Sequence, residues 1–283
     1  MKTASAKNAV CIMILITSIA VVMGVFFSFP HLAFAQERQS PLSEIQVIDG
    51  VRYISGLGIP KHARINWSER GVQRQSYAFK MPAAPSRNKN LTSWSSASFF
   101  GVSIDGVPIA HNFDAYWNDR LDWPEVYGRI DSYGGVKRDN GAYIYAGIPA
   151  RLIDKDLSHV GYAADGFPIF VSKRNKFKPS YRLKTGIRPS GERGPGGAYS
   201  GRYVTDYEYV KGSGLLDRCN GVLVKKKYYI YILTKEFPRV PLCWRASPDD
   251  SFRTVLLRNL QKSSSVADEE RPANDRKQRR RRR

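Results

Sequence analysis

The chain has 283 residues, of which 42% are hydrophobic and 25% charged. These values are ordinary for a globular protein with a core and exclude a wholly disordered chain. The 45 Lys and Arg residues outnumber the 25 Asp and Glu residues and give a net charge of +20. Such a surface attracts phospholipid headgroups, acidic glycans or nucleic acid, or else serves only to keep a soluble protein monomeric by repulsion.

The first predicted element is an apolar segment. Lys2 and Lys7 precede residues 9–29, which carry no charge, and Ala33-Phe34-Ala35 then places Gln36 at a signal-peptidase-like site. We therefore expect residues 1–35 to direct export, with the domain in the periplasm or outside the cell. At roughly 20 residues the apolar stretch is also long enough to span a bilayer, so an uncleaved membrane anchor through residues 9–29 stays open.

The middle of the chain predicts β-structure. Residues 36–90 form an N-terminal strand and loop segment, in which the alternation of Ile45, Val47, Val51 and Tyr53 favours a strand or hairpin around Asp49-Gly50. Residues 91–260 alternate short apolar or aromatic runs with Gly, Pro, Asp and Asn, and no run keeps helical periodicity. The predicted fold is one mainly β domain, sandwich- or barrel-like, with short helices and long loops.

The C-terminal residues 261–283 are polar and end in a basic run that we expect to be disordered, because like charges repel each other. Near an anionic membrane each such residue contributes on the order of 1 kcal/mol, so the run is predicted to bind an anionic envelope surface. The residues of this predicted contact are Arg276, Lys277, Arg279, Arg280, Arg281, Arg282 and Arg283. Export removes the opportunity to meet nucleic acid.

Two of the three cysteines lie in the predicted domain. An exported protein meets an oxidising environment, in which Cys219 and Cys243 are expected to form a disulfide. The bond would tie the Asn220-Gly221 turn to the strand that follows Pro241. Reactive thiols are the alternative.

Residues 91–252 resemble the YHYH-domain family of exported bacterial proteins. The longest matching block begins at His159. The blocks are residues 147–149 (Gly-Ile-Pro), 159–170 (His-Val-Gly-Tyr-Ala-Ala-Asp-Gly-Phe-Pro-Ile-Phe), 206–209 (Asp-Tyr-Glu-Tyr), 216–221 (Leu-Asp-Arg-Cys-Asn-Gly), 233–238 (Leu-Thr-Lys-Glu-Phe-Pro) and 241–244 (Pro-Leu-Cys-Trp). The resemblance implies a metal-binding role through the family's histidines, although the biochemical role of the family is not established.

The chain departs from the family at the histidines themselves. The Tyr-His-Tyr-His slot reads Tyr-Ile-Tyr-Ala here, a Gly-Gly-His reads Gly-Gly-Val, and a later Tyr-His-Tyr reads Tyr-Ile-Tyr. The altered positions are Val136, Ile144, Ala146 and Ile230. Since hydrocarbon side chains have no lone pairs to donate, we predict no cofactor.

A residual divalent-metal site at His159 and Asp165 is a weaker alternative, with Asp206, Glu208 and Asp217 as further oxygen donors. The competing interpretation is that Asp165-Gly166 and Asp105-Gly106 are turns, in which Asp bonds to the local backbone. Recurring Tyr-x-Tyr pairs place two rings on one strand face, either for packing or as a stacking surface.

Three functions follow from these patterns. The leading hypothesis is an exported, non-enzymatic binding or structural module that contacts an anionic envelope surface or a partner protein. The first alternative is a metal-binding module, and the second is a hydrolase of envelope polymers. The hydrolase would be favoured if Asp165 and Asp206 flanked a cleft, since no G-x-S-x-G motif is present.

Overall fold

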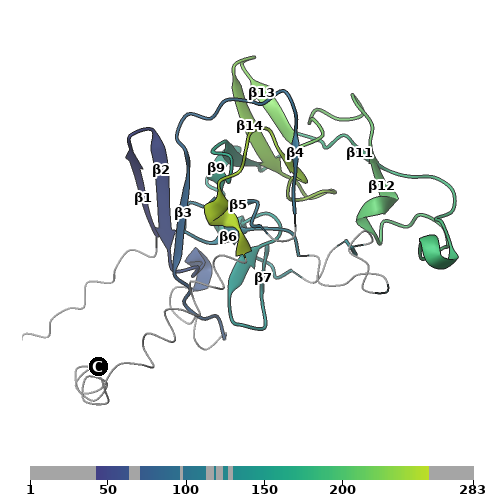
Figure 1. Cartoon of the computed structure of the whole chain (residues 1–283), viewed down its shortest axis with the longest axis horizontal. Helices are drawn as coiled ribbons and strands as arrows, with labels where there is room; N and C mark the ends of the chain where they lie inside the picture. Colours follow the sequence, from purple (N-terminus) through teal and green to yellow (C-terminus); the bar gives the residue numbers. More distant parts are fainter. Residues whose placement is uncertain are drawn as a thin grey trace, which may run out of the picture. The chain divides into compact units, whose positions relative to one another are not determined.

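The structure, a computed structural model, describes residues 43–63, 71–95, 98–112, 118, 124–126 and 130–254 (Figure 1). All of them belong to one compact unit, Ser40–Arg283. The predicted export segment 1–35, its apolar stretch 9–29 and the basic tail 261–283 lie outside the described residues. No helix in the described ranges is both long enough and apolar enough to cross a membrane.

Short strands joined by turns make up the described chain, and its helices are single 3-10 turns. A three-stranded sheet contains β1 (Ser43–Ile48), β2 (Val51–Gly56) and β3 (Tyr77–Pro82). An eight-stranded sheet contains β5 (Gly101–Ser103), β6 (Pro108–Ile109), β7 (Gly135–Lys137), β8 (Tyr143–Tyr145), β9 (Leu157–Ala163), β10 (Pro168–Ser172), β13 (Gly221–Val224) and β14 (Tyr228–Leu233). Two pairs, β4 (Thr92–Ser93) with β15 (Cys243–Trp244) and β11 (Tyr181–Leu183) with β12 (Tyr207–Tyr209), complete it.

The predicted hairpin at Asp49-Gly50 is confirmed. β1 and β2 pair in antiparallel register from Ser43 opposite Gly56 to Ile48 opposite Val51. Asp49 and Gly50 have φ of 48° and 76°, the left-handed region that a tight hairpin turn requires and that Asp and Gly tolerate best.

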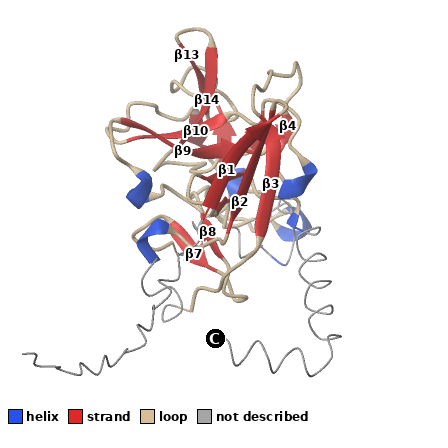
Figure 2. Cartoon of the chain, turned by 90° about the vertical axis from the view of Figure 1, so that its left-hand side faces the viewer, coloured by secondary structure: helices blue, strands red, loops and turns tan. Residues whose placement is uncertain are grey.

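The three-stranded sheet packs on the eight-stranded sheet through one face of β3 (Figure 2). Along β3 the residues alternate between buried and exposed, and Tyr77, Phe79 and Met81 belong to the main core together with Val102 and Tyr231 of the other sheet. The predicted mainly β domain is therefore confirmed as a sandwich-like arrangement. Its larger sheet is open, because β13 and β7 end it without pairing with each other.

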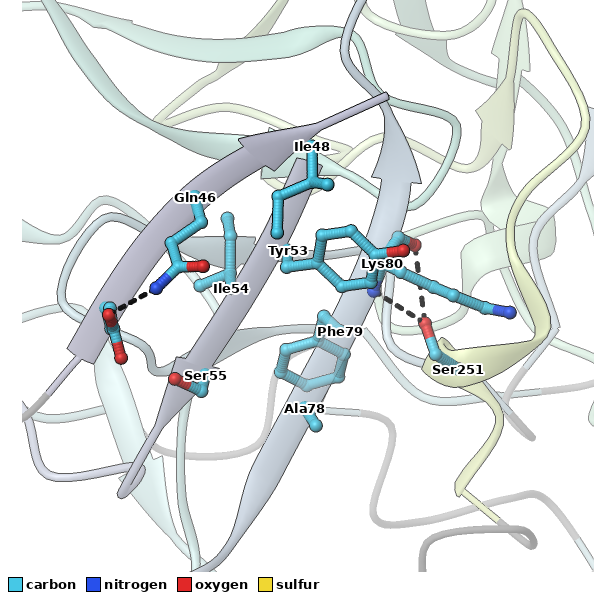
Figure 3. Close-up of a pocket in the computed structure, with 10 residues that line it drawn as sticks. Gln46, Ile48, Tyr53, Ile54, Ser55, Ala78, Phe79, Lys80 and Ser251 are labelled. Carbon is cyan, nitrogen blue, oxygen red and sulfur yellow. Dashed lines mark hydrogen bonds between the residues drawn. The ribbon is translucent and has the colours of Figure 1, made fainter. Parts of the chain in front are cut away.

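The two edges of the three-stranded sheet differ. At the β3 edge the Ser251 hydroxyl accepts a 3.0 Å hydrogen bond from the Lys80 N–H and donates to the Lys80 carbonyl (Figure 3). At the other edge β1 is largely exposed, with Val47 and Ile48 turned to solvent. A backbone edge that is not covered in this way is available for pairing.

The eight-stranded sheet consists of two similar halves. Its strand order is β13-β14-β10-β9-β5-β6-β8-β7. Each half begins with an antiparallel hairpin, β5–β6 or β9–β10. Next to the second strand of the hairpin in the sheet lies a parallel strand, β8 or β14. That strand pairs in turn with an antiparallel outer strand, β7 or β13. The two hairpin turns share the sequence Asp-Gly-x-Pro-Ile, at Asp105-Gly106 and at Asp165-Gly166.

The registers show that the halves are related by an approximate two-fold axis. At the centre Val102 pairs with its equivalent, Tyr162, and the two flanking pairs, Gly101 with Ala163 and Ser103 with Gly161, are related to each other by the axis. Ile109 of β6 pairs with Tyr145, just as Ile169 of β10 pairs with Tyr231. The eight-stranded sheet is thus one four-stranded unit built twice.

The second half contains a disulfide and a side lobe. Cys219 and Cys243 are bonded, with Cα atoms 5.0 Å apart, which confirms the predicted pairing of the 219–221 turn with the segment after Pro241. In the side lobe, which carries β11 and β12, the Arg188 guanidinium donates two 2.7 Å hydrogen bonds to the buried Asp206 carboxylate. Paired and hydrogen-bonded in this way, the ions hold the long chain between β10 and β13 in place.

The disulfide gives the first prediction. Replacing both Cys219 and Cys243 with Ala removes a cross-link between residues 24 positions apart, so the free energy of unfolding should fall by about 3 kcal/mol. Urea unfolding followed by tyrosine fluorescence measures this change. Wild-type protein unfolded in excess reductant is the control and should match the variant, whereas a variant as stable as the oxidised wild type would contradict the prediction.

Candidate functional site

The Tyr-x-Tyr pairs of β8 and β14 lie in the main core rather than on a surface. Tyr145 and Tyr231 have no exposed area, and Tyr143 and Tyr229 have 3% and 5%. The two rings of each pair meet edge to face, at 5.6 Å in β8 and 5.2 Å in β14. For these two pairs the packing interpretation holds, and a phenol buried so deeply needs a hydrogen-bond partner.

The partner of Tyr231 is the carboxylate of Asp165, in the turn between β9 and β10. The Tyr231 hydroxyl donates a 2.7 Å hydrogen bond to Oδ2, which also accepts from the backbone N–H groups of Arg245 and Ala246 at 3.0 Å. Burial raises the pKa of Asp165 to about 6, because desolvation outweighs these hydrogen bonds. Burial and the charge of Asp165 together raise the pKa of Tyr231 well above its ordinary range.

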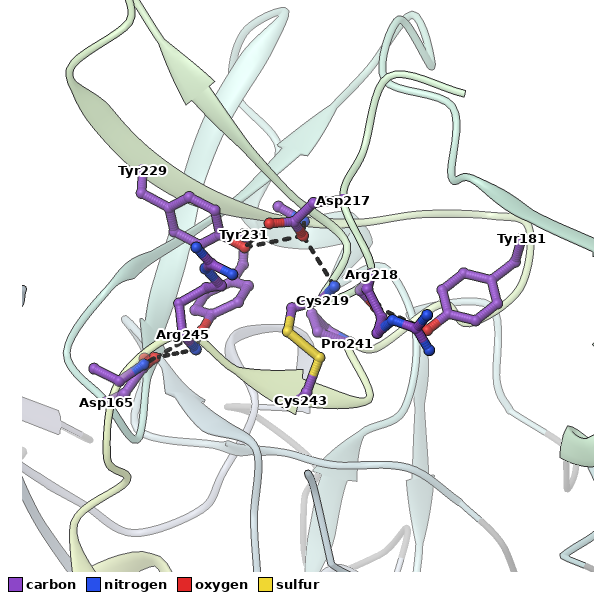
Figure 4. The surroundings of a disulfide bond; sticks show 12 residues. Asp165, Tyr181, Asp217, Arg218, Cys219, Tyr229, Tyr231, Pro241, Cys243 and Arg245 are labelled. Carbon is purple, nitrogen blue, oxygen red and sulfur yellow. Dashed lines mark hydrogen bonds between the residues drawn. A yellow bond between two sulfur atoms is a disulfide. The ribbon is translucent and has the colours of Figure 1, made fainter. Parts of the chain in front are cut away.

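The partner of Tyr229 is Asp217, at the start of the disulfide turn (Figure 4). The Tyr229 hydroxyl lies 3.0 and 3.1 Å from the two carboxylate oxygens. One of these oxygens also accepts from the backbone N–H groups of Cys219 and Gly221, at 2.9 and 3.0 Å. A Cβ at Gly221 would overlap the Tyr229 hydroxyl, which explains why glycine stands there.

The first half repeats both arrangements. The Tyr145 hydroxyl donates to Asp105 at 3.1 Å, and the same Oδ2 accepts the backbone N–H of Lys61 at 2.9 Å. The Tyr143 hydroxyl donates to Asp131 at 2.8 Å, and the other oxygen of Asp131 accepts two backbone N–H groups of its own turn. We call these four pairs the carboxylate–tyrosine anchors, two in each half.

The structure separates Ile230 from the other three altered signature positions. Val136 and Ile144 are cross-strand neighbours on β7 and β8, and the buried Ala146 follows β8 directly. Ile230 pairs with Val222 at the opposite end of the sheet. There it belongs to a separate small core that contains Leu216 and Ile232.

His159 and Asp165, the two predicted metal ligands, have different surroundings. The His159 ring packs against Tyr162 and Phe170, and Phe170 adjoins the small core, whereas Asp165 contacts Tyr231 in the main core. Desolvation lowers the pKa of His159, and the positive charge of Arg52 adds to this effect. Nε2 of His159 is buried without a hydrogen-bond partner among the described residues.

The donor set does not fit the transition-metal role that the family resemblance implies. Ile144 and Ile230 offer only hydrocarbon, and no three His, Cys, Asp or Glu side chains within the described ranges are grouped so that they could hold a metal ion. The predicted ligand role of His159 and Asp165 stays a prediction. The hydrolase hypothesis gains no support, because Asp165 and Asp206 have no exposed area and bind different partners.

The few charged residues that are buried in the described chain are mostly acids. Asp105, Asp165 and Asp206 are at most 7% exposed, whereas Arg188 is the one Lys or Arg among the buried described residues. Asp131 and Asp217 are also occupied by hydrogen bonds inside the fold. Burial therefore removes more negative than positive charges from the described surface.

A comparison with protein-family models identifies the relatives of this fold. The model described as YHYH protein matches residues 78–246, which is more than half of the chain. The chain belongs to the YHYH protein family. No curated protein and no solved structure matches it. In this YHYH protein the signature tyrosines are members of the carboxylate–tyrosine anchors.

Sequence reasoning missed the first-half anchors and assigned their second-half counterparts, Asp165 and Asp217, to a tentative cation site. The signal that could have found all four pairs is the repetition of Asp-Gly-x-Pro-Ile at residues 105–109 and 165–169, followed in each half by Tyr-Ile-Tyr. A repeated turn and a repeated strand in the same order indicate repeated contacts between them.

The duplicated anchors predict matched losses of stability. Replacing Tyr231 or Tyr145 with Phe removes the hydroxyl that satisfies a buried carboxylate, so each change should lower the free energy of unfolding by about 1–3 kcal/mol. Tyr228, which is 57% exposed on the same strand as Tyr231, gives the control variant Tyr228→Phe, with an expected change near zero. Urea unfolding checks this, and a Tyr231→Phe variant as stable as Tyr228→Phe would show that the anchor contributes nothing.

Asp165 predicts a pH dependence of stability. Its pKa rises from the ordinary 3.8 to about 6 on folding, so its contribution is fully present below pH 3.8 and is lost as the pH rises through 6. The Asp165→Asn variant lacks this titration. The stability of the wild type relative to Asp165→Asn should therefore fall by on the order of 3 kcal/mol across this window. Urea unfolding at a series of pH values measures the difference, and a flat difference would contradict the raised pKa.

Proposed function

We propose that this YHYH protein is an exported, non-enzymatic binding module that acts at the cell envelope through its basic surface. The observation that carries the proposal is that burial removes more acidic than basic side chains from the described surface. Three Asp side chains are buried in the fold, whereas almost every Lys and Arg of the described chain remains at the surface. The anchors thus hold the fold together and leave the cations for external contacts.

The size of the charge supports an anionic partner. A net charge of +20 raises the local concentration of anions and speeds their association with the protein, and salt weakens this attraction by screening. The basic tail 276–283, the predicted tether, accounts for seven of the cations in this total. Contacts of this kind need no reacting group.

Export is supported by the sequence before Gln36 and is consistent with the disulfide. Disulfides persist in oxidising compartments and are rare where thiols are kept reduced. The Cys219–Cys243 bond closes a native loop in the core, as expected of a structural cross-link. A protein exported in this way meets lipid headgroups and envelope polymers and does not meet nucleic acid.

The proposal predicts selective binding to anionic vesicles. The full chain should sediment with phosphatidylglycerol vesicles and much less with phosphatidylcholine vesicles, because each basic residue near an anionic surface contributes on the order of 1 kcal/mol. Binding should weaken as salt is raised. A variant with the seven basic residues of 276–283 replaced by Gln should bind more weakly but still prefer the anionic vesicles.

Two controls make the vesicle experiment decisive. Circular dichroism and thermal unfolding of the tail variant must match the wild type, so that a change in binding reports on charge alone. Equal binding of the wild type to both kinds of vesicle, or binding that salt does not weaken, would contradict an electrostatic envelope module.

A further inference from the structure

An open groove of about 560 Å³ lies beside the anchors of the second half. The buried rings of Tyr229 and Phe167 form part of its lining, the β13–β14 turn contributes Lys227, and the segment after β15 contributes Arg245. The loop after β3 supplies Arg87 and Lys89. Four cationic side chains from three separate segments therefore converge on one cavity.

These four cations have no carboxylate partner in the described structure. The ion pairs of the described residues involve other cations, such as Arg174 with Asp156 and Lys178 with Glu236. Asp217, the acid that binds the groove residue Tyr229, already accepts the Tyr229 hydroxyl and two backbone N–H groups. Like charges gathered without a counter-charge repel each other, and an anion in the groove would relieve this repulsion.

Arg245 is held in position for such a contact. Its backbone N–H donates to Asp165 and its carbonyl accepts the N–H of Asn88 at 2.6 Å. Its guanidinium lies over the Tyr229 ring, 5.7 Å from the centroid (Figure 4). Nε of this side chain is buried and has no hydrogen-bond partner among the described residues. An oxyanion would satisfy a donor that is otherwise costly to bury.

The first half shows that the fold does not require this groove. By the β7–β8 and β13–β14 registers, Gly141 occupies the place of Lys227. There Gln73 closes the space: its N–H donates to the Gly141 carbonyl at 2.8 Å, and its side chain packs where a Cβ of Gly141 would lie. The second half keeps the equivalent space open and surrounds it with cations.

The turn next to the groove carries backbone strain. Lys225 and Lys226 have φ of 51° and 55°, in the left-handed region that costs an ordinary L-residue roughly 1–2 kcal/mol and that Gly or Asn enters easily. Strained residues persist at binding sites where their side chains are needed. Here the strain accompanies three consecutive lysines, of which Lys227 lines the groove.

We propose that this groove is a binding site for a phosphate group. A tetrahedral phosphate has enough oxygens and charge to contact Arg245, Lys227 and the loop cations together, whereas a carboxylate offers two oxygens and one charge. The phosphate is carried by an envelope lipid or is free or polymer-borne. This inference takes one thing from the proposed function, namely the compartment in which the protein meets phosphate.

The test uses the folded full chain and inorganic phosphate as the probe. Phosphate binding is followed by isothermal titration calorimetry and by NMR shifts of the tyrosine rings, with acetate and sulfate as comparison anions. Phosphate should bind more tightly than acetate at equal ionic strength. Lys227→Gln, an exposed change, should weaken phosphate binding roughly tenfold or more, and Arg245→Gln at least as much.

Lys61→Gln is the matched control, because the Lys61 N–H bonds to Asp105 as the Arg245 N–H bonds to Asp165, yet Lys61 does not line the groove. This variant should bind phosphate as the wild type does. Acetate binding as tight as phosphate, or equal losses in Lys61→Gln and Lys227→Gln, would overturn the site. If phosphate fails while anionic vesicles still bind, the groove is wrong and the proposed function stands.

A second arm separates the sources of the phosphate. The variant with the neutralised tail is sedimented with phosphatidylcholine vesicles that contain phosphatidic acid, with and without the further change Lys227→Gln. Loss of vesicle binding with Lys227→Gln supports the site and assigns it to a lipid phosphate. Unchanged vesicle binding, together with the loss of inorganic phosphate binding, supports the site and assigns it to free or polymer-borne phosphate.

Discussion

The hydrogen bond between a buried tyrosine hydroxyl and a buried Asp carboxylate is the constraint on which the structure depends. A carboxylate far from water is costly unless every oxygen has a partner. Tyr231 meets this need for Asp165, and in doing so it fixes β14 against the β9–β10 turn and against the backbone of Arg245. The same bond between Tyr145 and Asp105 fixes the first half. Each strand is thereby held in one register.

The unit occurs twice, so features present in both halves are those that the fold requires, and features of one half alone are additions to it. Both halves keep the anchors and the glycines that admit them, so the tyrosines of the YHYH signature serve the architecture. The positions between the tyrosines, Ile144 and Ile230, lie in different hydrophobic clusters, and their hydrocarbon character is compatible with the fold. Within the described residues the disulfide, the lysine turn and the cationic groove all lie in the second half, and it is in this half that we expect binding.

Local patterns in the sequence predicted a large part of this account. The hairpin at Asp49-Gly50, the turn at Asp165-Gly166 and the pairing of Cys219 with Cys243 follow from backbone preference and redox environment, and the structure confirms them. The two-fold repeat was missed because the matching pieces are short and the second half carries the long insertion with β11 and β12. The groove could not be predicted, since it needs side chains from three distant segments. The basic tail lies outside the described residues and stays a prediction.

The most direct test of the central claim is a double-mutant cycle between Asp165 and Tyr231. The free energies of unfolding of the wild type, Asp165→Asn, Tyr231→Phe and the double variant are measured at one pH above 6, where the carboxylate is ionised. If the hydrogen bond holds the strand and the turn together, the two changes will be coupled, with an interaction energy of about 1–3 kcal/mol. Strictly additive effects would contradict the claim and would mean that each residue only fills space in the core.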